Sequence, residues 1–148
     1  MAKEKILTGV SGEYFVAAEL SKRGYVASIT LRNTRGIDIL VSNSEASLTV
    51  GIQVKTNTGN RKSWILNKKA ENYSEKNLFY VFVNLKSTNE RPDYYIVPSE
   101  DVANRIKIVH NRWLSTPGKR GQQHRDNPMR IFSDKDDKYF EKWELLGL

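Results

Sequence analysis

The strictest constraint on this fold comes from two nearby segments in which apolar residues occupy every second position. The first spans residues 36–41 and the second residues 48–55. The apolar side chains are Ile37, Ile39 and Val41 in the first segment, and Leu48, Val50, Ile52 and Val54 in the second. A period of two is that of a β-strand with one apolar face. Asp38 in the first strand, and Gln53 and Lys55 in the second, are therefore expected on the opposite face.

Further signals in the sequence place helices around these strands. A helix is expected over residues 11–23, because Ser11 can cap its first turn and Gly24 can take the left-handed conformation after its last. Val16 and Leu20 share one stripe of that helix. The other expected elements, in chain order, are a strand over 25–31, turns over 33–36 and 43–47, a loop over 58–62, a short helix over 68–75, strands over 78–85 and 94–97, a helix over 99–114, an irregular stretch over 117–128 and a helix over 135–146.

The order of these elements predicts an α/β fold, because three successive strands and a crossover helix give a mixed sheet flanked by helices. The apolar run over 78–85 is typical of a strand covered on both faces. Ser99 is expected to cap the helix over 99–114, with Asp101 in its first turn. The side chains expected to face the core from the last helix are Tyr139, Phe140, Trp143 and Leu146.

Composition narrows the class of protein. A chain of 148 residues, 39% hydrophobic and 28% charged, is expected to form one soluble domain over residues 1–148. The chain has no cysteine, which excludes disulfides and thiolate metal sites. No apolar run suits a membrane span or a signal segment, so a cytoplasmic location and no membrane partner are expected. The net charge of +7 favours contact with a polyanion such as nucleic acid.

The polar residues of the two alternating strands are expected to form a cluster. Lys55 lies in an apolar strand, where a buried charge is costly unless it pairs with an acidic group or has a functional role. Paired strands bring opposite side chains to about 5 Å, so Asp38, Gln53 and Lys55 can converge. Glu13 precedes Val16 by three residues and shares its inward stripe, which directs a second carboxylate to the same place.

Such a cluster suits phosphodiester hydrolysis. Mg²⁺ or Mn²⁺ takes oxygen ligands, here the carboxylates of Asp38 and Glu13 and the amide oxygen of Gln53. A divalent ion eases deprotonation of a bound water and neutralises charge on the reacting phosphate. Lys55 is expected to hold the attacking hydroxide or to stabilise the developing oxyanion.

The ordered set Glu13, Gly-Ile-Asp38 and Gln53-Val-Lys55 resembles the PD-(D/E)xK nuclease superfamily, whose core is an αβββαβ arrangement. It is most similar to branches, including Mrr-like restriction enzymes, in which Gln replaces the acid before x-Lys. The resemblance implies that Asp38 is the motif aspartate, Gln53 and Lys55 the catalytic pair, and Glu13 the helix-borne acid. It covers the element order of residues 1–85, and the remainder, with its extra C-terminal helices, resembles small bacterial proteins of the same superfamily.

The resemblance implies a Mg²⁺- or Mn²⁺-dependent endonuclease that hydrolyses DNA in restriction, defence or repair. Two departures leave an alternative open: Ile37 stands where the motif has proline, and Gln53 is neutral. Both are also typical of a degenerate site in a nucleic-acid-binding or protein-interaction module. Asp38 and Lys55 also fit a plain salt bridge, and Glu13 an exposed first-turn acid. A dimeric regulator with a basic face is a third reading, and a homodimer is left open.

Basic residues after Lys55 are the candidate contacts to phosphate. They are Arg61, Lys62, Lys68 and Lys69. Trp64 among them fits either a stacking platform for a base or a core position. A second basic stretch, with Lys119, Arg120, His124, Arg125 and Arg130, fits either a substrate cover or plain surface. His110 and His124 show no metal-ligand spacing and receive no role.

Overall fold

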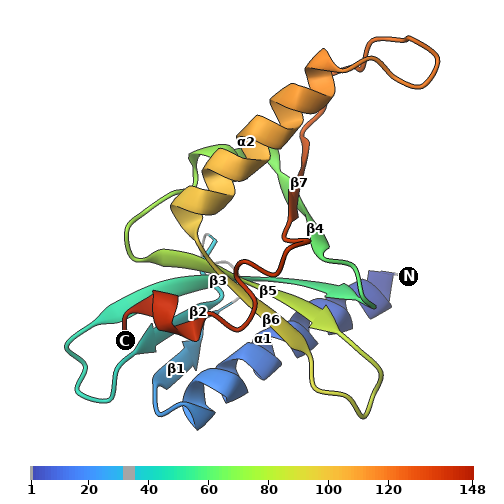
Figure 1. Ribbon diagram of the computed structural model, residues 1–148. Helices are drawn as coiled ribbons and strands as arrows, with labels where there is room; N and C mark the ends of the chain where they lie inside the picture. Colours follow the sequence, from blue (N-terminus) through green and yellow to red (C-terminus); the bar gives the residue numbers. More distant parts are fainter. Residues whose placement is uncertain (1, 32–35) are drawn as a thin grey trace.

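A five-stranded mixed sheet organises the protein in the computed structural model, which describes residues 2–31 and 36–148 (Figure 1). The elements in chain order are α1 (Ala2–Lys22), β1 (Val26–Ile29), β2 (Ile39–Ser42), β3 (Thr49–Thr58), β4 (Ser63–Asn67), the 3₁₀ turn η1 (Lys68–Asn72), β5 (Leu78–Leu85), β6 (Asp93–Pro98), α2 (Ser99–Ser115), β7 (Met129–Ser133) and the 3₁₀ turn η2 (Trp143–Leu146). The order in the sheet is β1-β2-β3-β5-β6, with β3 and β5 parallel and the other neighbours antiparallel.

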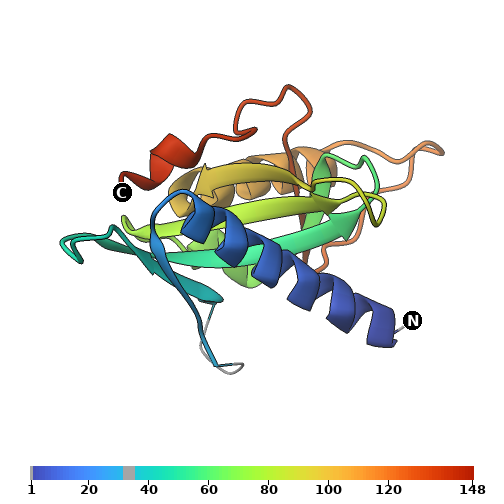
Figure 2. The ribbon, with the colours of Figure 1, turned by 90° about the horizontal axis from the view of Figure 1, so that it is seen from below.

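The sheet separates two apolar cores. Helix α1 covers one face, while α2, η1 and the β4–β7 pair cover the other (Figures 1 and 2). Strand β5 serves both cores, because Val81 points to the α1 side and Phe82 to the α2 side, and both are fully buried. The expectation that residues 78–85 form a strand covered on both faces is confirmed. The predicted hairpin of β2 and β3 is also present, with Ile39 opposite Ile52.

Two helix starts differ from the prediction. Helix α1 begins at Ala2, so Ser11 lies inside it and caps nothing. The residues before Ser11 contain no proline, and nothing in them stops the helix. Helix α2 begins at Ser99 as the first helical residue, and Pro98 occupies the cap position. The Ser99 hydroxyl instead donates to the Glu75 carbonyl oxygen at 2.9 Å and accepts from the Glu75 N–H. Gly24 has the expected positive φ.

The predicted helix over 135–146 is wrong except for η2. The Asp134 carboxylate accepts from the backbone N–H groups of Lys138 and Tyr139, which holds a turn instead. Asp137 and Glu141 also have positive φ, a conformation that interrupts a helix. The expected core residues therefore separate: Trp143 and Leu146 join the α1-side core, Tyr139 packs beside the other, and Phe140 is partly exposed.

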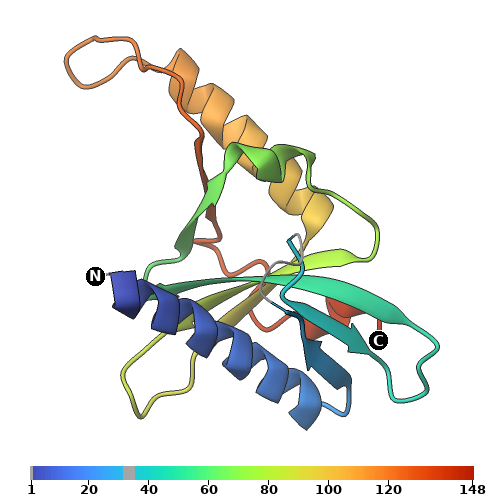
Figure 3. The same ribbon diagram turned by 180° about the vertical axis from the view of Figure 1, so that it is seen from behind.

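The sequence did not predict β4 and β7, which pair antiparallel as a separate two-stranded sheet (Figure 3). β4 occupies part of the interval between β3 and the expected short helix, which is the 3₁₀ turn η1 capped by the Asn67 side chain. Residues 33–35 of the turn expected over 33–36 lie outside the described residues. In the ranges 2–31 and 36–148, no helix is long and apolar enough to cross a membrane.

Candidate active site

Asp38 lies one residue before β2, where the β2–β3 ladder ends. Its backbone N–H donates to the Ile52 carbonyl oxygen at 2.8 Å, but the hairpin register pairs Ile52 with Ile39, so Asp38 lies one residue out of that register. Its Oδ2 accepts from the Val54 N–H at 2.7 Å. The carboxylate thus takes the position that a backbone acceptor of β2 would have held, at the end of the strand and between the two faces of the sheet.

Gln53 and Lys55 point to the α2 side of β3, as the alternation predicts. Their ladder partners in β5 are Tyr80 and Phe82, which belong to the α2-side core. Both polar side chains are half-buried. Val54, the residue between them, is buried in the core on the α1 side of the sheet.

Glu13 reaches Asp38 from the helix on the opposite face. The close approach of α1 to β3 makes this contact, because a Cβ on Gly12 would lie 1.8 Å from Thr56 Oγ1 and 2.9 Å from Thr56 Cβ. The half-buried Glu13 side chain shares a hydrogen bond with the Asp38 carboxyl group. Lys55 is near enough for its ammonium charge to act on the same group. Glu13, Asp38 and Lys55 therefore meet at the end of β2.

The electrostatics of Asp38 reflect this crowding. Burial raises the pKa of Asp38 above its ordinary value, and this is the largest effect. The Val54 N–H, the Lys55 ammonium and the hydrogen bond with Glu13 lower that pKa, but they only partly offset burial.

Tyr73 is a neighbour of the site that the sequence analysis missed. Burial raises the pKa of Tyr73, and the negative charge of Asp38 raises it further, which places the phenol near that carboxylate. Gly36 has φ +63, and a Cβ there would lie 2.3 Å from Tyr73 Oη. A glycine two residues before Asp38 was the available signal, since both its conformation and its close contact exclude a side chain.

Two cavities adjoin these residues and share Lys55. One, of about 660 Å³, lies between β3 and the β4–η1 segment and is lined by Gly36, Gln53, Lys55, Lys69 and Tyr73, among others. The second, of about 400 Å³, extends from Lys55 along the outer side of β4, past Arg61. The candidate site is therefore open to a ligand larger than an ion.

The candidate phosphate contacts differ in position. Lys69 lines the first cavity and Arg61 the second, whereas Lys68 is exposed on η1. Lys62 Nζ is 2.8 Å from the Asp137 carboxylate, so its charge is partly neutralised. Trp64 is 2% exposed and donates its indole N–H to the Val83 carbonyl oxygen at 3.0 Å, so the core alternative is confirmed.

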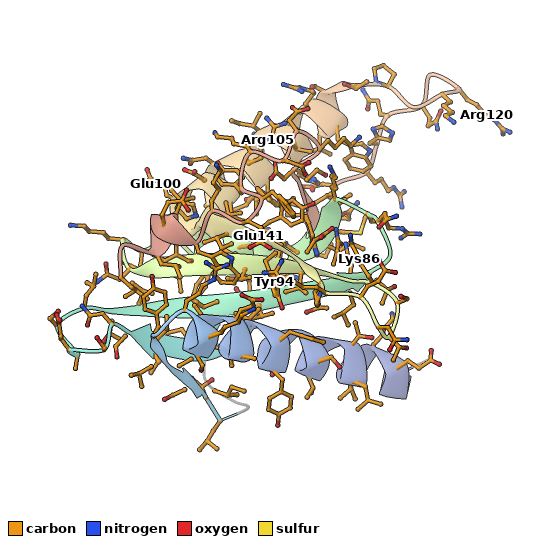
Figure 4. All side chains as sticks on the ribbon, turned by 60° about the horizontal axis from the view of Figure 1, so that its bottom comes forward. Lys86, Tyr94, Glu100, Arg105, Arg120 and Glu141 are labelled. Atoms are coloured by element: carbon orange, nitrogen blue, oxygen red, sulfur yellow. The ribbon has the colours of Figure 1, made fainter. Side chains whose placement is uncertain are left out.

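The second basic stretch does not gather at the site. Arg130 is buried and pairs with Glu71 at 2.7 Å. Arg120 lies at the far end of the loop after α2 (Figure 4). His110 Nε2 is 2.7 Å from an Asp126 carboxylate oxygen, and the His124 ring stacks on Trp113. Neither histidine contacts Asp38.

The donors present fit a hard divalent cation. Two carboxyl groups in direct contact must share either a proton or a cation, because both charges cannot stand side by side uncompensated. Glu13 and Asp38 are such a pair. Gln53 carries an amide oxygen and lines the adjoining cavity. Oxygen-only donors suit Mg²⁺ or Mn²⁺. Among the described residues no group of three His, Cys, Asp or Glu forms a metal cage, so water would have to complete the coordination.

The comparisons with known proteins bear on the fold. No protein-family model matches the sequence, and no curated protein matches it either. The solved structure of the bacterial homing endonuclease I-Ssp6803I is similar, with a TM-score of 0.51 and 16% identity over 95% of this chain and 90% of that one. A Holliday junction resolvase, Hjc of the archaeal hyperthermophile Archaeoglobus fulgidus, has a TM-score of 0.44 and 14% identity over 85% and 84%.

The likeness to I-Ssp6803I establishes the class of fold. This chain has a restriction-endonuclease-like α/β fold, with a mixed sheet flanked by helices. The predicted fold class is confirmed. The element order differs from αβββαβ in one place: between β3 and β5 the chain forms β4 and the 3₁₀ turn η1 in place of an α-helix, and β7 pairs with β4.

Proposed function

We propose that this protein is a metal-dependent endonuclease that hydrolyses DNA phosphodiester bonds. The observation that carries the proposal is the meeting of Glu13, Asp38 and Lys55 beside a cavity with basic residues. The nuclease-like fold supports it. The likeness to a PD-(D/E)xK site with a Q-x-K pair is part of the same proposal, as are a bacterial origin, a cytoplasmic location and a role in restriction, defence or repair.

The residues have distinct roles in this proposal. Asp38, Glu13 and Gln53 hold Mg²⁺ or Mn²⁺, which when bound supplies Lewis-acid chemistry and charge neutralisation. The backbone N–H of Val54 fixes the orientation of Asp38. Lys55 orients the attacking water and donates to the oxygen on which negative charge develops. Arg61, Lys62, Lys68 and Lys69 bind the phosphate backbone on either side, and a homodimer would present two such sites to two strands.

Cleavage assays test this proposal directly. The full chain is incubated with plasmid, linear duplex, junction and single-stranded DNA, and with RNA, in Mg²⁺, Mn²⁺, Ca²⁺ or EDTA. We expect Mg²⁺- or Mn²⁺-dependent cleavage of DNA that falls about 100-fold or more in Lys55→Ala, the scale for loss of one donor to a developing charge. Equal activity of the wild-type protein and Lys55→Ala would show that a contaminant, and not this site, cuts the DNA.

A non-catalytic nucleic-acid-binding module is the second candidate. The neutral Gln53 favours it, because the site then offers only two carboxylates to a cation. Titration with Mn²⁺ separates the two. An active site binds the ion and loses it in Asp38→Ala, whereas a binding module retains DNA affinity with no bound ion and no cleavage.

A further inference from the structure

The β4–β7 pair is a two-stranded ribbon whose outer face carries exposed apolar side chains and borders α2, with which Met129 and Ile131 line a small cavity. Its inner face contributes Trp64, Leu66 and Phe132 to the α2-side core. On its outer face, Ile65 and Ile131 lie directly opposite each other and are 68% and 38% exposed. Met129, 47% exposed, continues the same face. Contiguous apolar surface of this kind typically marks an interaction site.

The ribbon is placed to bring a ligand to the candidate site. β4 begins shortly after β3 ends, and with β7 beside it extends away from the five-stranded sheet (Figures 1 and 3). The cavity of about 400 Å³ is lined by Lys55 on one side and by Ile65 and Ile131 on the other. The outer face of the ribbon and the candidate catalytic lysine therefore border the same space.

The charge around the ribbon specifies an anionic partner. Arg61 precedes β4, and Lys68 and Lys69 follow it. Among residues 2–31 and 36–148, no acidic side chain forms an ion pair with any of these three, whereas Lys62 and Arg130 are paired. The two unneutralised basic ends are complementary to phosphates, and the apolar strip between them can contact the thymine methyl groups that the major groove exposes.

We propose that the outer face of the β4–β7 ribbon enters the major groove of duplex DNA and so sets a phosphodiester at Lys55. This inference rests on the proposed function and names its substrate class. The major groove of B-DNA, about 12 Å wide, admits a two-stranded ribbon. Five-residue strands are about 16 Å long, which corresponds to about five base pairs. Ile65 and Ile131 contact base edges, including thymine methyl groups. The narrow major groove of A-form RNA excludes the ribbon.

Binding measurements test the ribbon without requiring cleavage. The full chain is titrated, in EDTA, against a fluorescent DNA duplex, the corresponding single strand and an RNA duplex of the same sequence. The variants are Ile65→Glu and Ile131→Glu, which place negative charge between the phosphate rims. The matched control is Ile108→Glu, because Ile108 is 52% exposed on α2, two residues from the buried Ile106 and hence on the outward face of that helix.

We expect both ribbon variants to lose about tenfold or more in affinity for duplex DNA. The control should stay within about twofold of the wild-type protein. Thermal unfolding of all variants should match the wild type, since the substituted side chains are exposed. Wild-type affinity in Ile65→Glu, or equal affinity for the RNA duplex or the single strand, would overturn the inference. So would a wild-type dimer in sedimentation that Ile65→Glu dissociates, because the ribbon would then be a subunit interface.

The DNA-binding role of the ribbon and the proposed hydrolytic site can be disproved independently of each other. Suppose that Lys55→Ala abolishes cleavage while Ile65→Glu binds and cleaves duplex DNA as the wild-type protein does. The proposed active site is then supported, and the ribbon does not bind the major groove. If the ribbon variants lose duplex binding but no preparation cuts any substrate, the ribbon stands and the proposed hydrolysis is wrong.

Discussion

The carboxyl group of Asp38 has lost much of its contact with water, and three neighbours replace that contact only in part. Burial therefore raises its pKa above the ordinary value. The folded protein then binds the Asp38 proton more tightly than the unfolded chain does. The free energy of unfolding falls as pH rises from the ordinary value through the folded pKa, so at neutral pH the ionised Asp38 destabilises the fold. A cost of this kind is typical of residues kept for function.

Replacing Asp38 with asparagine should separate stability from activity. The asparagine side chain would keep an oxygen that can accept from the Val54 N–H, but it carries no charge to desolvate. We expect Asp38→Asn to raise the free energy of unfolding at pH 7, measured by chemical denaturation, and to reduce cleavage about 100-fold or more. A variant less stable than the wild type would show that contacts of the ionised group outweigh its burial.

Binding of a divalent ion should offset the loss of stability that the ionised Asp38 causes at neutral pH. An ion that binds the folded state alone raises the melting temperature by mass action. We expect Mg²⁺ or Mn²⁺ to raise the Tm of the wild-type protein at neutral pH, and this shift to vanish as pH falls through the raised pKa of Asp38, because the protonated carboxyl group no longer binds metal. Thermal scans at several pH values measure it. An equal shift in Asp38→Asn would place the ion elsewhere.

Among the elements, the crossing of α1 over β3 decides where Glu13 lies. Gly12 makes this crossing close, because Thr56 occupies the space that a side chain would need. Rotation of the Thr56 hydroxyl would not relieve the contact, since Thr56 Cβ is itself 2.9 Å from the added atom. The separation between helix and strand is therefore fixed by one glycine, next to the acid that reaches Asp38.

Alanine substitutions at two glycines of α1 should have opposite effects. Nothing lies within 4 Å of a Cβ added at Gly9, so Gly9→Ala should stabilise the protein by about 0.5–1 kcal/mol through helix propensity alone. Gly12→Ala gains the same propensity but forces helix and strand apart, and we expect a net loss of about 1–3 kcal/mol and slower cleavage. Denaturant unfolding and cleavage rates of both variants test this. Equal stability changes would mean that α1 shifts without cost.

The sequence predicted those elements whose patterns are local. Strict alternation located β2 and β3, and an apolar run located β5. It missed β4 and β7, because their pairing joins residues 62 to 70 positions apart and short strands carry little pattern of their own. The prediction of a helix over 135–146 was wrong for a similar reason, because the Asp134 carboxylate holds a turn that the spacing of apolar residues does not reveal.

Prediction of the candidate site had the same limit. The alternation and the helix stripe indicated that Glu13, Asp38, Gln53 and Lys55 would converge, and the structure brings Glu13, Asp38 and Lys55 together. Tyr73 comes from a segment after η1, and only the folded chain places its phenol beside Asp38 and Gly36. Tertiary contacts of this kind leave no spacing in the sequence.

Across the whole molecule, Glu19 and Glu141 form the largest cluster of ion pairs among the described residues. Arg91 bridges Glu19 and Glu141, and Arg23 lies over the Trp143 ring, so one charge network fixes the C-terminal segment beside α1 and β6. Figure 4 shows Glu141 close to Tyr94 on that side. Near Lys55, Arg61 and Lys69 form no ion pair among the described residues, so their positive charges are available to a polyanion.

This distribution makes the salt dependence of DNA binding a test at the scale of the molecule. Each phosphate contact contributes about −0.9 to the slope of log affinity against log salt concentration. We expect Arg61→Ala and Lys69→Ala each to make that slope shallower by about 1. Lys142→Ala should leave it unchanged, because Lys142 is exposed beside η2, away from both cavities. Anisotropy titrations at several salt concentrations measure the slopes. Equal slopes in all three variants would mean that DNA binds the positive charge of the protein without using the face that carries Lys55.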